Sequence, residues 1–178
     1  MTSTHTKKLP LQLGYSTNVH PGEDMKAVYR SLEEYTIPIR KRVFGSEPCG
    51  LELRLGIGSA KDLATRKARL EFRDYLEESG LVLFSVNAYP LSDFHARRVK
   101  ETVYQPSWGS PQRASWTSKI GRIVDEIAPK GIKVSISTLG GCFRGHGHTP
   151  AIFRKLAANY LSTLETLLDI EAATGRTM

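Results

Sequence analysis

The sequence predicts an α/β fold with a parallel sheet, built from four consecutive βα units that form half of a (βα)8 TIM barrel. Segments with strand patterning alternate with segments of helical spacing, and no two strands are adjacent in sequence. Parallel strands require such helical crossovers. The third strand segment, 81–87, is a nearly continuous apolar run, which is typical of a strand covered on both faces. A complete barrel needs eight units and about 250 residues, so these 178 residues are expected to supply the first half.

The first unit is expected to begin with a strand over 11–19 that ends before Pro21-Gly22. Apolar positions then recur at helical spacing from Met25 to Tyr35. Asp24 precedes them and is a suitable N-cap, since its carboxylate can accept from the free amides of the first turn. Pro38 lacks an amide donor and is expected to kink or restart this helix.

The second unit is expected to begin with a strand from Gly50 to about Gly58, because apolar and other residues alternate there. Gly56 and Gly58 inside this strand indicate tight packing or a close ligand approach. Ser59 is expected in the following turn. A helix from about Thr65 should end at Ser79-Gly80, since glycine favours helix ends.

The third and fourth units carry the clearest helix starts. Ser110-Pro111 and Thr149-Pro150 each combine an N-cap with a proline at the first helical position. The strand of the fourth unit is expected over 132–138, and the last helix should end at Thr174-Gly175. A long connection over 88–109 separates the third strand from its helix, and long loops in compact domains often carry function. Its aromatic residues are expected either to line a pocket or to pack the loop onto the sheet.

Composition and charge narrow the functional classes. The net charge is +7, but the basic residues are dispersed and interleave with acids, so we expect no nucleic-acid partner. No apolar run approaches the roughly 20 residues of a membrane span, and the first 14 residues have no signal-peptide core. We therefore expect a cytoplasmic protein with reduced Cys49 and Cys142. Residues 1–8 are predicted to be a disordered tail and 9–178 a truncated barrel domain.

Ligands of such folds bind where the strands lead into the following loops. The residues selected by this rule are Asn18, His20, Gly58, Ser59, Asn87, Tyr89, His95, Ser137, Thr138, Arg144, His146 and His148. His20 with nearby Glu23 is predicted as an acid–base pair, because histidine titrates near neutral pH. The alternative is that His20 anchors its own loop through backbone hydrogen bonds.

The glycine-rich segment GGCFRGHGH contains His146 and His148. Two histidines do not make a zinc site, which needs three or four ligands. The alternatives are a flexible loop with incidental histidines, or backbone amides that approach an anion beside Arg144. Carboxylates are scarce near the strand ends, and hard cations prefer them as ligands. We therefore predict no metal for this chain alone.

Three segments, LGYSTNVHPGED, NAYPLSDFHARRVKETVYQPSW and SISTLGG, together resemble the metabolite traffic proteins of the EboE type. This family is a branch of the xylose-isomerase-like, sugar-phosphate isomerase/epimerase-like TIM barrels. The resemblance extends from about Leu13 to the end of the chain. It implies that pocket residues are to be found among Asn18, His20, Asn87, Tyr89, His95, Ser137 and Thr138. Family members are about twice as long, and a full-length barrel of the wider superfamily can hold a divalent metal through residues of its later strands.

The resemblance implies a protein that handles a small sugar-like or phosphorylated metabolite. One hypothesis is an isomerase or epimerase that is complete only with a second half, so this chain alone is expected to be inactive. The alternative is a non-catalytic binding or carrier component that works with a membrane partner without inserting into the bilayer itself. A third hypothesis, a metal-dependent DNA-repair nuclease of the same superfamily, is disfavoured by the dispersed charge. Expected partners are the metabolite and either a second copy of this chain or a missing C-terminal half-barrel.

Overall fold

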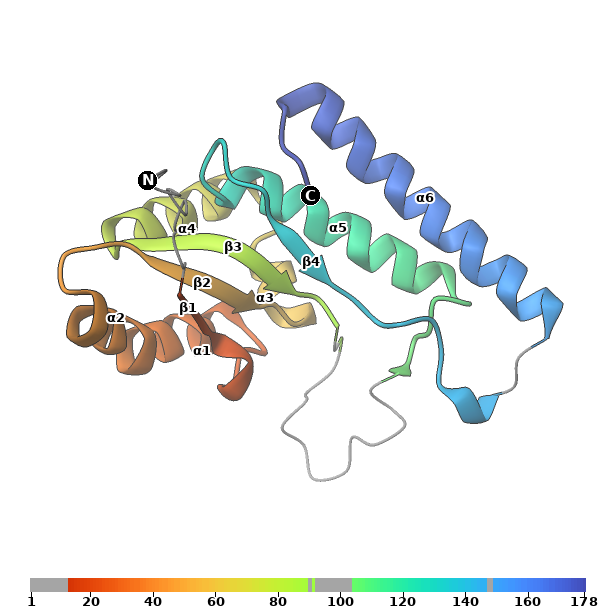
Figure 1. Cartoon of the computed structure of the whole chain (residues 1–178), viewed down its shortest axis with the longest axis horizontal. Coiled ribbons are helices and arrows are strands. Elements are labelled where there is room, and N and C mark those ends of the chain that lie inside the picture. The colour runs from red at the N-terminus through yellow and green to blue at the C-terminus, as the bar shows by residue number, and fades with distance from the viewer. Residues whose placement is uncertain (1–12, 90, 92–103, 147–148) are drawn as a thin grey trace, which may run out of the picture.

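The computed structural model describes residues 13–89, 91, 104–146 and 149–178. Its centre is a parallel four-stranded sheet in the order β1-β2-β3-β4. The strands are β1 (Gly14–Ser16), β2 (Cys49–Arg54), β3 (Leu81–Asn87) and β4 (Ser135–Ser137). Helices separate successive strands along the chain (Figure 1). The predicted α/β class and the four βα units are confirmed.

Helix starts follow the cap residues expected from the sequence. The helices after β1 are α1 (Met25–Ser31), the π-helical η2 (Leu32–Thr36) and α2 (Ile37–Phe44). Those after β2 and β3 are α3 (Ile57–Asp62), α4 (Arg66–Glu78) and α5 (Pro111–Ile127), and α6 (Pro150–Thr174) follows β4. The side chains of Asp24, Thr65, Ser110 and Thr149 each accept a first-turn amide. The caps at Asp24, Ser110 and Thr149 were predicted correctly, and so was a helix start near Thr65, because these features depend only on local sequence.

Two local expectations were wrong. Ile57 and Gly58 do not extend β2, because that strand ends at Arg54 and Gly56 is the N-cap of α3. The Gly56 amide donates to the Ser59 hydroxyl oxygen at 3.1 Å, which favours the helical turn over an extended strand. The strands β1 and β4 are also shorter than predicted, and Thr17–Val19 forms a 3₁₀ turn. Near Pro38 the helix continues through η2, where the π-helical turn precedes the proline.

The hydrophobic core lies between the sheet and the helices on one of its faces. Strand side chains that enter it alternate along β2 and β3: Cys49, Leu51, Leu53, Leu81, Leu83 and Val86. They meet apolar residues of α1, α4 and α5, including Val28, Phe72 and Ile120. We call this the outer face of the sheet. Hydrophobic burial on this face is the main stabilising term of the fold.

The opposite face, here called the inner face, is less covered than the sequence suggested. Phe84 of β3 points to it and is 42% exposed, and Val82 is half-buried. Helices of this chain therefore cover β3 on its outer face, while the inner face leaves Phe84 exposed. A register shift opposite Leu51/Glu52 interrupts the alternation of β3 at Phe84, so that Leu83 pairs with Leu51 and Ser85 pairs with Glu52.

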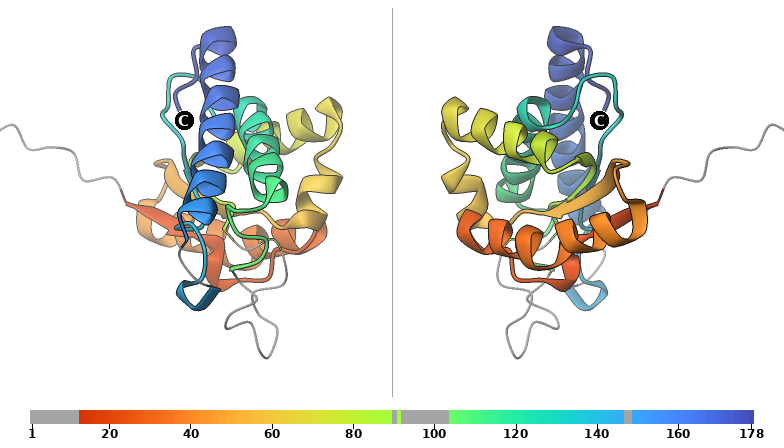
Figure 2. Two further views of the ribbon diagram at one scale, coloured as in Figure 1. Left: turned by 90° about the vertical axis from the view of Figure 1, so that its right-hand side faces the viewer. Right: turned by 90° about the vertical axis from the view of Figure 1, so that its left-hand side faces the viewer.

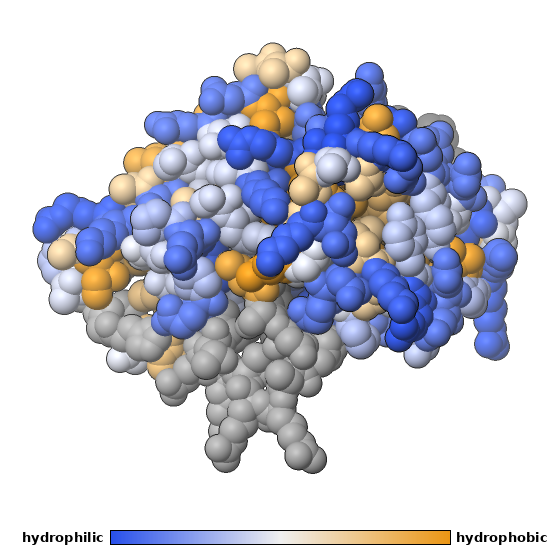
Figure 3. Space-filling view, turned by 180° about the vertical axis from the view of Figure 1, so that it is seen from behind, coloured by the Kyte–Doolittle hydropathy of each residue, from blue (hydrophilic) through white to orange (hydrophobic). Residues whose placement is uncertain are grey.

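Helix α6 lies beside α5 at the β4 end of the sheet, as the views from the two sides show (Figure 2). Leu167 of α6 packs so closely on α5 that a Cβ on Gly121 would lie 2.5 Å from its Cδ2 atom. Seen from behind the view of Figure 1, the surface is mostly hydrophilic with small separate apolar areas (Figure 3). Among the described residues, no helix is both long and apolar enough to cross a membrane.

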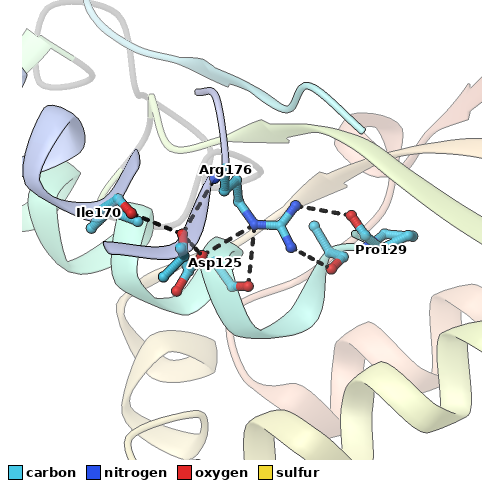
Figure 4. A network of polar contacts seen from close by, with 6 residues as sticks. Asp125, Pro129, Ile170 and Arg176 are labelled. Carbon is cyan, nitrogen blue, oxygen red and sulfur yellow. Dashed lines mark hydrogen bonds and ion pairs between the residues drawn. The ribbon is translucent and has the colours of Figure 1, made fainter. Parts of the chain in front are cut away.

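The last residues of the described chain return to the bottom of the sheet, where the strands begin. Arg176 is buried and donates to the carbonyl oxygens of Ala128 and Pro129 at 2.8 and 2.9 Å (Figure 4). It also forms an ion pair with Asp125 at 3.2 Å. The guanidinium thus satisfies carbonyls at the C-terminal end of α5, which helices leave without partners.

Replacing Arg176 with methionine is expected to lower the free energy of unfolding by about 2 kcal/mol, since several charge-assisted hydrogen bonds are lost while water re-solvates part of the helix end. Urea denaturation followed by circular dichroism measures this loss. The matched control is Arg66→Met. Arg66 is exposed, and its ion pair with Glu126 is long, at 3.9 Å. Equal stability of the two variants would contradict the capping role.

Candidate binding site

Two rows of polar side chains run across the strands on the inner face, near the C-terminal ends of the strands. The lower row aligns Ser16, Glu52, Ser85 and Ser135. The upper row aligns Arg54, Asn87 and Ser137. Residues that alternate with them, such as Leu53 and Val86, point into the core, so the side chains of both rows point to the inner face. Aligned positions of parallel strands lie side by side, so the rows form one continuous polar surface.

Below the lower row, Phe84 covers two glycines of the neighbouring strands. A Cβ on Gly14 would lie 2.6 Å from the Cε1 atom of Phe84, and one on Gly50 would lie 3.1 Å from its ring. Only residues without a side chain let the ring lie flat on the sheet at these positions. The inner face therefore carries an exposed aromatic ring next to polar side chains, and apolar surface with a few polar groups is common in small-molecule sites.

The lower row contains a carboxylate beside two hydroxyl groups. The Ser135 hydroxyl donates to the Ser85 hydroxyl oxygen at 2.9 Å across β3 and β4. Glu52 is half-buried on β2, and the described residues provide its carboxylate with no hydrogen bond or ion pair. A carboxylate and two hydroxyls can accept and donate hydrogen bonds to the hydroxyl groups of a ligand.

Arg54 in the upper row is a buried cation, only 2% exposed. Its Nη2 atom lies 2.5 Å from Oε1 of Glu23, which follows β1. Its Nε and Nη1 atoms are buried and have no hydrogen-bond partner among the described residues. Buried N–H groups without a partner are costly. Guanidinium N–H groups form short charge-assisted hydrogen bonds with oxyanions, so an oxyanion is a chemically suitable partner for these two atoms.

The loop that carries Glu23 is held in place by α3. The Ser59 hydroxyl donates to the Gly22 carbonyl oxygen at 2.8 Å, and the Ser59 amide donates to the Glu23 carbonyl oxygen at 2.9 Å. A Cβ on Gly58 would collide with that same carbonyl oxygen. The close approach expected at Gly58 is thus made by the chain's own backbone. Gly58 and Ser59 position Glu23.

His20 lies on the outer side of the sheet. Its Nε2 atom is 2.7 Å from the Tyr15 hydroxyl, and its ring stacks on Tyr35 with centroids 4.2 Å apart. Burial raises the pKa of the Tyr15 hydroxyl, with a smaller contribution from Tyr35. His20 and Glu23, predicted as one acid–base pair, therefore take part in separate sets of contacts. The acid–base role of the pair stays a prediction.

Five other predicted site residues lie at or just after the strand ends. Oδ1 of Asn18 and Oγ1 of Thr138 are buried and lack a hydrogen-bond partner among the described residues. The Asn87 side chain accepts from the Tyr89 amide at 2.9 Å. Tyr89 packs edge-on against Tyr104 with ring centroids 6.4 Å apart. Asn18, Asn87, Ser137 and Thr138 thus share the C-terminal edge of the sheet with Arg54.

A second buried guanidinium, that of Arg113 in the first turn of α5, braces the chain after β3. It donates to the carbonyl oxygens of Pro106 and Tyr89, both at 2.8 Å. Burial lowers the pKa of Arg113, and the nearby Tyr89 and Tyr160 oppose this effect. Trp108 is fully buried beside it, so this aromatic residue packs its segment onto α6. Of the two roles expected for aromatic residues of the long connection, lining a pocket or packing the loop, Trp108 has the second.

Three predicted residues cannot be placed in the site. His95 and His148 lie outside the described residues, and only the backbone of His146 is described, in the 3₁₀ turn η4 (Arg144–His146). Cys49 is a buried free thiol and Cys142 a half-buried one. Among the described residues, no group of three or more His, Cys, Asp and Glu side chains is arranged to hold a metal ion.

Sequence reasoning did not select Glu52, Arg54 and Arg113. Glu52 and Arg54 are polar members of an alternating strand, and such residues ordinarily face solvent. The available signal was position, since Arg54 is the last residue of β2 and Glu52 lies two residues before it. A cavity of about 900 Å³ opens elsewhere, between the start of β3 and the C-terminal ends of α4 and α5. Its lining includes Gly80, Leu81 and the Arg176 cap, so it belongs to the opposite edge of the sheet.

Comparison with known proteins finds no family model and no curated protein that matches this chain.

Proposed function

We propose that the inner face binds a small sugar-like metabolite that carries a phosphate or carboxylate group. The observation that supports this most strongly is Arg54, which is almost fully buried yet has two nitrogen atoms without a partner among the described residues. Glu23 neutralises the cation through one of its three nitrogens. The remaining N–H groups are donors of the kind that bind an oxyanion through charge-assisted hydrogen bonds.

The rest of the ligand is assigned from the two polar rows. Glu52, Ser85 and Ser135 belong to the lower row, on β2, β3 and β4. Asn87 and Ser137 belong to the upper row. Side chains that both donate and accept suit a molecule with several hydroxyl groups. Phe84 below them offers an apolar surface for the C–H face of such a molecule. The resemblance to metabolite traffic proteins favours the same ligand class and a binding or carrier role.

A second candidate function is isomerase or epimerase chemistry on the same ligand. The observation that favours it is Glu52, a half-buried carboxylate without a described hydrogen-bond partner. Such a group can act as the base that removes a proton beside a carbonyl. The His20–Glu23 pair is the other proposed base, and it would first have to leave its contacts with Tyr35 and Arg54.

The test measures binding of glucose 6-phosphate, glucose and inorganic phosphate by isothermal titration calorimetry. Glucose 6-phosphate is expected to bind most tightly, because it engages both Arg54 and the hydroxyl-binding rows. Arg54→Met should weaken its binding about tenfold or more, a loss typical of a charge-assisted contact. Glu52→Gln should weaken the sugar phosphate and leave inorganic phosphate unchanged.

Arg66→Met is the matched control, since Arg66 is an exposed cation of α4, away from the inner face. Circular dichroism confirms the fold of each variant before titration. Equal loss of affinity in the Arg66 and Arg54 variants would show a non-specific charge effect and refute the site. Proton exchange at C2 of the sugar phosphate, abolished in Glu52→Gln, would favour the isomerase over the carrier.

A further inference from the structure

The two lateral ends of the sheet both carry exposed apolar side chains. On α6, beside β4, Leu161, Leu164 and Leu168 are 59%, 51% and 61% exposed. Their spacing places them on one side of the helix, next to the side that packs on α5. At the other end, Tyr35 of η2 and Val43 of α2 are 45% and 62% exposed. The β4 end therefore presents an apolar stripe on α6, and the other end presents two separate apolar side chains, one on η2 and one on α2.

The strands at these ends are short parallel edges of equal length. β1 and β4 each have three residues, and within the described part of the chain each pairs on one side only, with β2 and β3 respectively. Thr177 accepts from the Val134 amide at 3.2 Å, so the chain's own end covers the start of the β4 edge. The edge beyond it, around Ile136, is long enough for a strand as short as β1. Unpaired edges of this kind bind other strands.

The charges on α6 and α2 are complementary if the two helices lie side by side with β4 and β1 parallel. From Tyr160 to Thr174, α6 carries Glu165, Asp169 and Glu171 but no lysine or arginine. The C-terminal half of α2 carries exposed Lys41 and Arg42. Both helices end at the level where the strands begin, since α2 leads into β2 and Thr177 bonds to Val134 just before β4. The acidic end of one therefore matches the basic end of the other.

We propose that a second copy of this chain docks on these ends, with β1 of each copy adding in parallel to β4 of the other. One twofold axis generates both contacts, as is usual for closed homodimers. The result is a closed ring of eight parallel strands, the number found in a (βα)8 barrel. Helix α6 of each copy then packs on η2 and α2 of its partner.

This assembly also closes the inner face. The polar rows of the two copies point into one shared interior, and each Phe84 ring leaves solvent. An eight-stranded barrel interior is just wide enough for side chains or one small ligand. The proposal rests on the edges and helix faces, and it stands or fails independently of the ligand assigned above.

The first test is sedimentation velocity of the full chain over a range of concentrations. Asp169→Arg and Arg42→Glu are each expected to weaken dimerisation about tenfold by placing like charges at the contact, and the double variant should restore it. Glu78→Arg is the control, because Glu78 is an exposed acid of α4 away from both ends. A monomer at every concentration, or single variants that dimerise as well as the wild type, would overturn the proposal.

Disulfide cross-linking tests the register of the contact. Leu168→Cys and Val43→Cys are combined in a Cys142→Ser background, which leaves buried Cys49 in place. The combined variant should form a covalent dimer under mild oxidation, while each single variant stays monomeric on non-reducing gels. Cross-linking of the Leu168→Cys variant alone would indicate an α6–α6 contact and refute the pairing of β1 with β4. Loss of sugar-phosphate binding in Arg54→Met with normal dimerisation separates the two proposals.

Discussion

Replacing Trp108 with alanine is expected to lower the free energy of unfolding by about 3–5 kcal/mol, the usual cost of removing a large buried aromatic side chain. Trp108 is 1% exposed, stacks on Tyr160 with ring centroids 3.9 Å apart, and donates from Nε1 to the Leu139 carbonyl oxygen at 2.8 Å. It joins the segment before α5, the loop after β4 and the middle of α6. Alanine there leaves a cavity at the meeting point of these three segments.

Two conservative variants separate packing from hydrogen bonding. Trp108→Phe keeps most of the ring but loses the indole donor, and Tyr160→Phe loses only the hydroxyl that donates to Leu139 at 2.7 Å. Each is expected to cost about 1 kcal/mol from the lost hydrogen bond. Urea denaturation by circular dichroism, at one fixed protein concentration, measures all three variants. A Trp108→Ala loss no larger than that of Tyr160→Phe would contradict the packing role.

Replacing Glu23 with alanine is expected to lower the free energy of unfolding by about 3 kcal/mol, because it leaves the buried Arg54 cation without its counter-charge. Breaking a buried ion pair costs about 3–5 kcal/mol. The lower end applies here since the Glu23 side chain is 39% exposed and solvent screens part of the interaction. Urea denaturation is again the measurement.

The double variant Glu23→Ala/Arg54→Met provides the decisive comparison. It removes both charges, so it should be more stable than Glu23→Ala alone. Glu33→Ala is the matched control, since Glu33 is an exposed carboxylate of η2, and it should change stability by less than about 0.5 kcal/mol. A double variant less stable than Glu23→Ala would show that Arg54 stabilises the fold through contacts other than its ion pair.

Helix starts were predictable because their causes are local. Thr65, Ser110 and Thr149 each accept a first-turn amide, and the proline after Ser110 and Thr149 needs no amide partner. The end of β2 was not predictable from alternation. Ile57 continues the apolar period of the strand but is 41% exposed in α3, where Gly56 and Ser59 set the turn. The alternation of apolar residues therefore continues to Ile57, although β2 ends at Arg54.

The candidate site was predicted only in part. The rule for strand ends selected Asn87 and Ser137, which the register aligns with Arg54. It missed Arg54 itself, because a charged residue in an alternating strand is ordinarily solvated. It also placed His20 among the pocket candidates, whereas the ring stacks on Tyr35 on the outer side. Which side a loop residue takes depends on a helix packed against it, and Tyr35 belongs to a later element.

The sequence by itself determined the order of strands and helices, the caps and the parallel class of the sheet. These depend on spacing, on proline and glycine, and on side chains that bond within their own turn. Only the tertiary structure decided which sheet face is polar, that Phe84 lies on Gly14 and Gly50, and that Glu23 meets Arg54. The physical reason is that these contacts join residues about 30 or more positions apart. Their energies depend on burial, which no local pattern specifies.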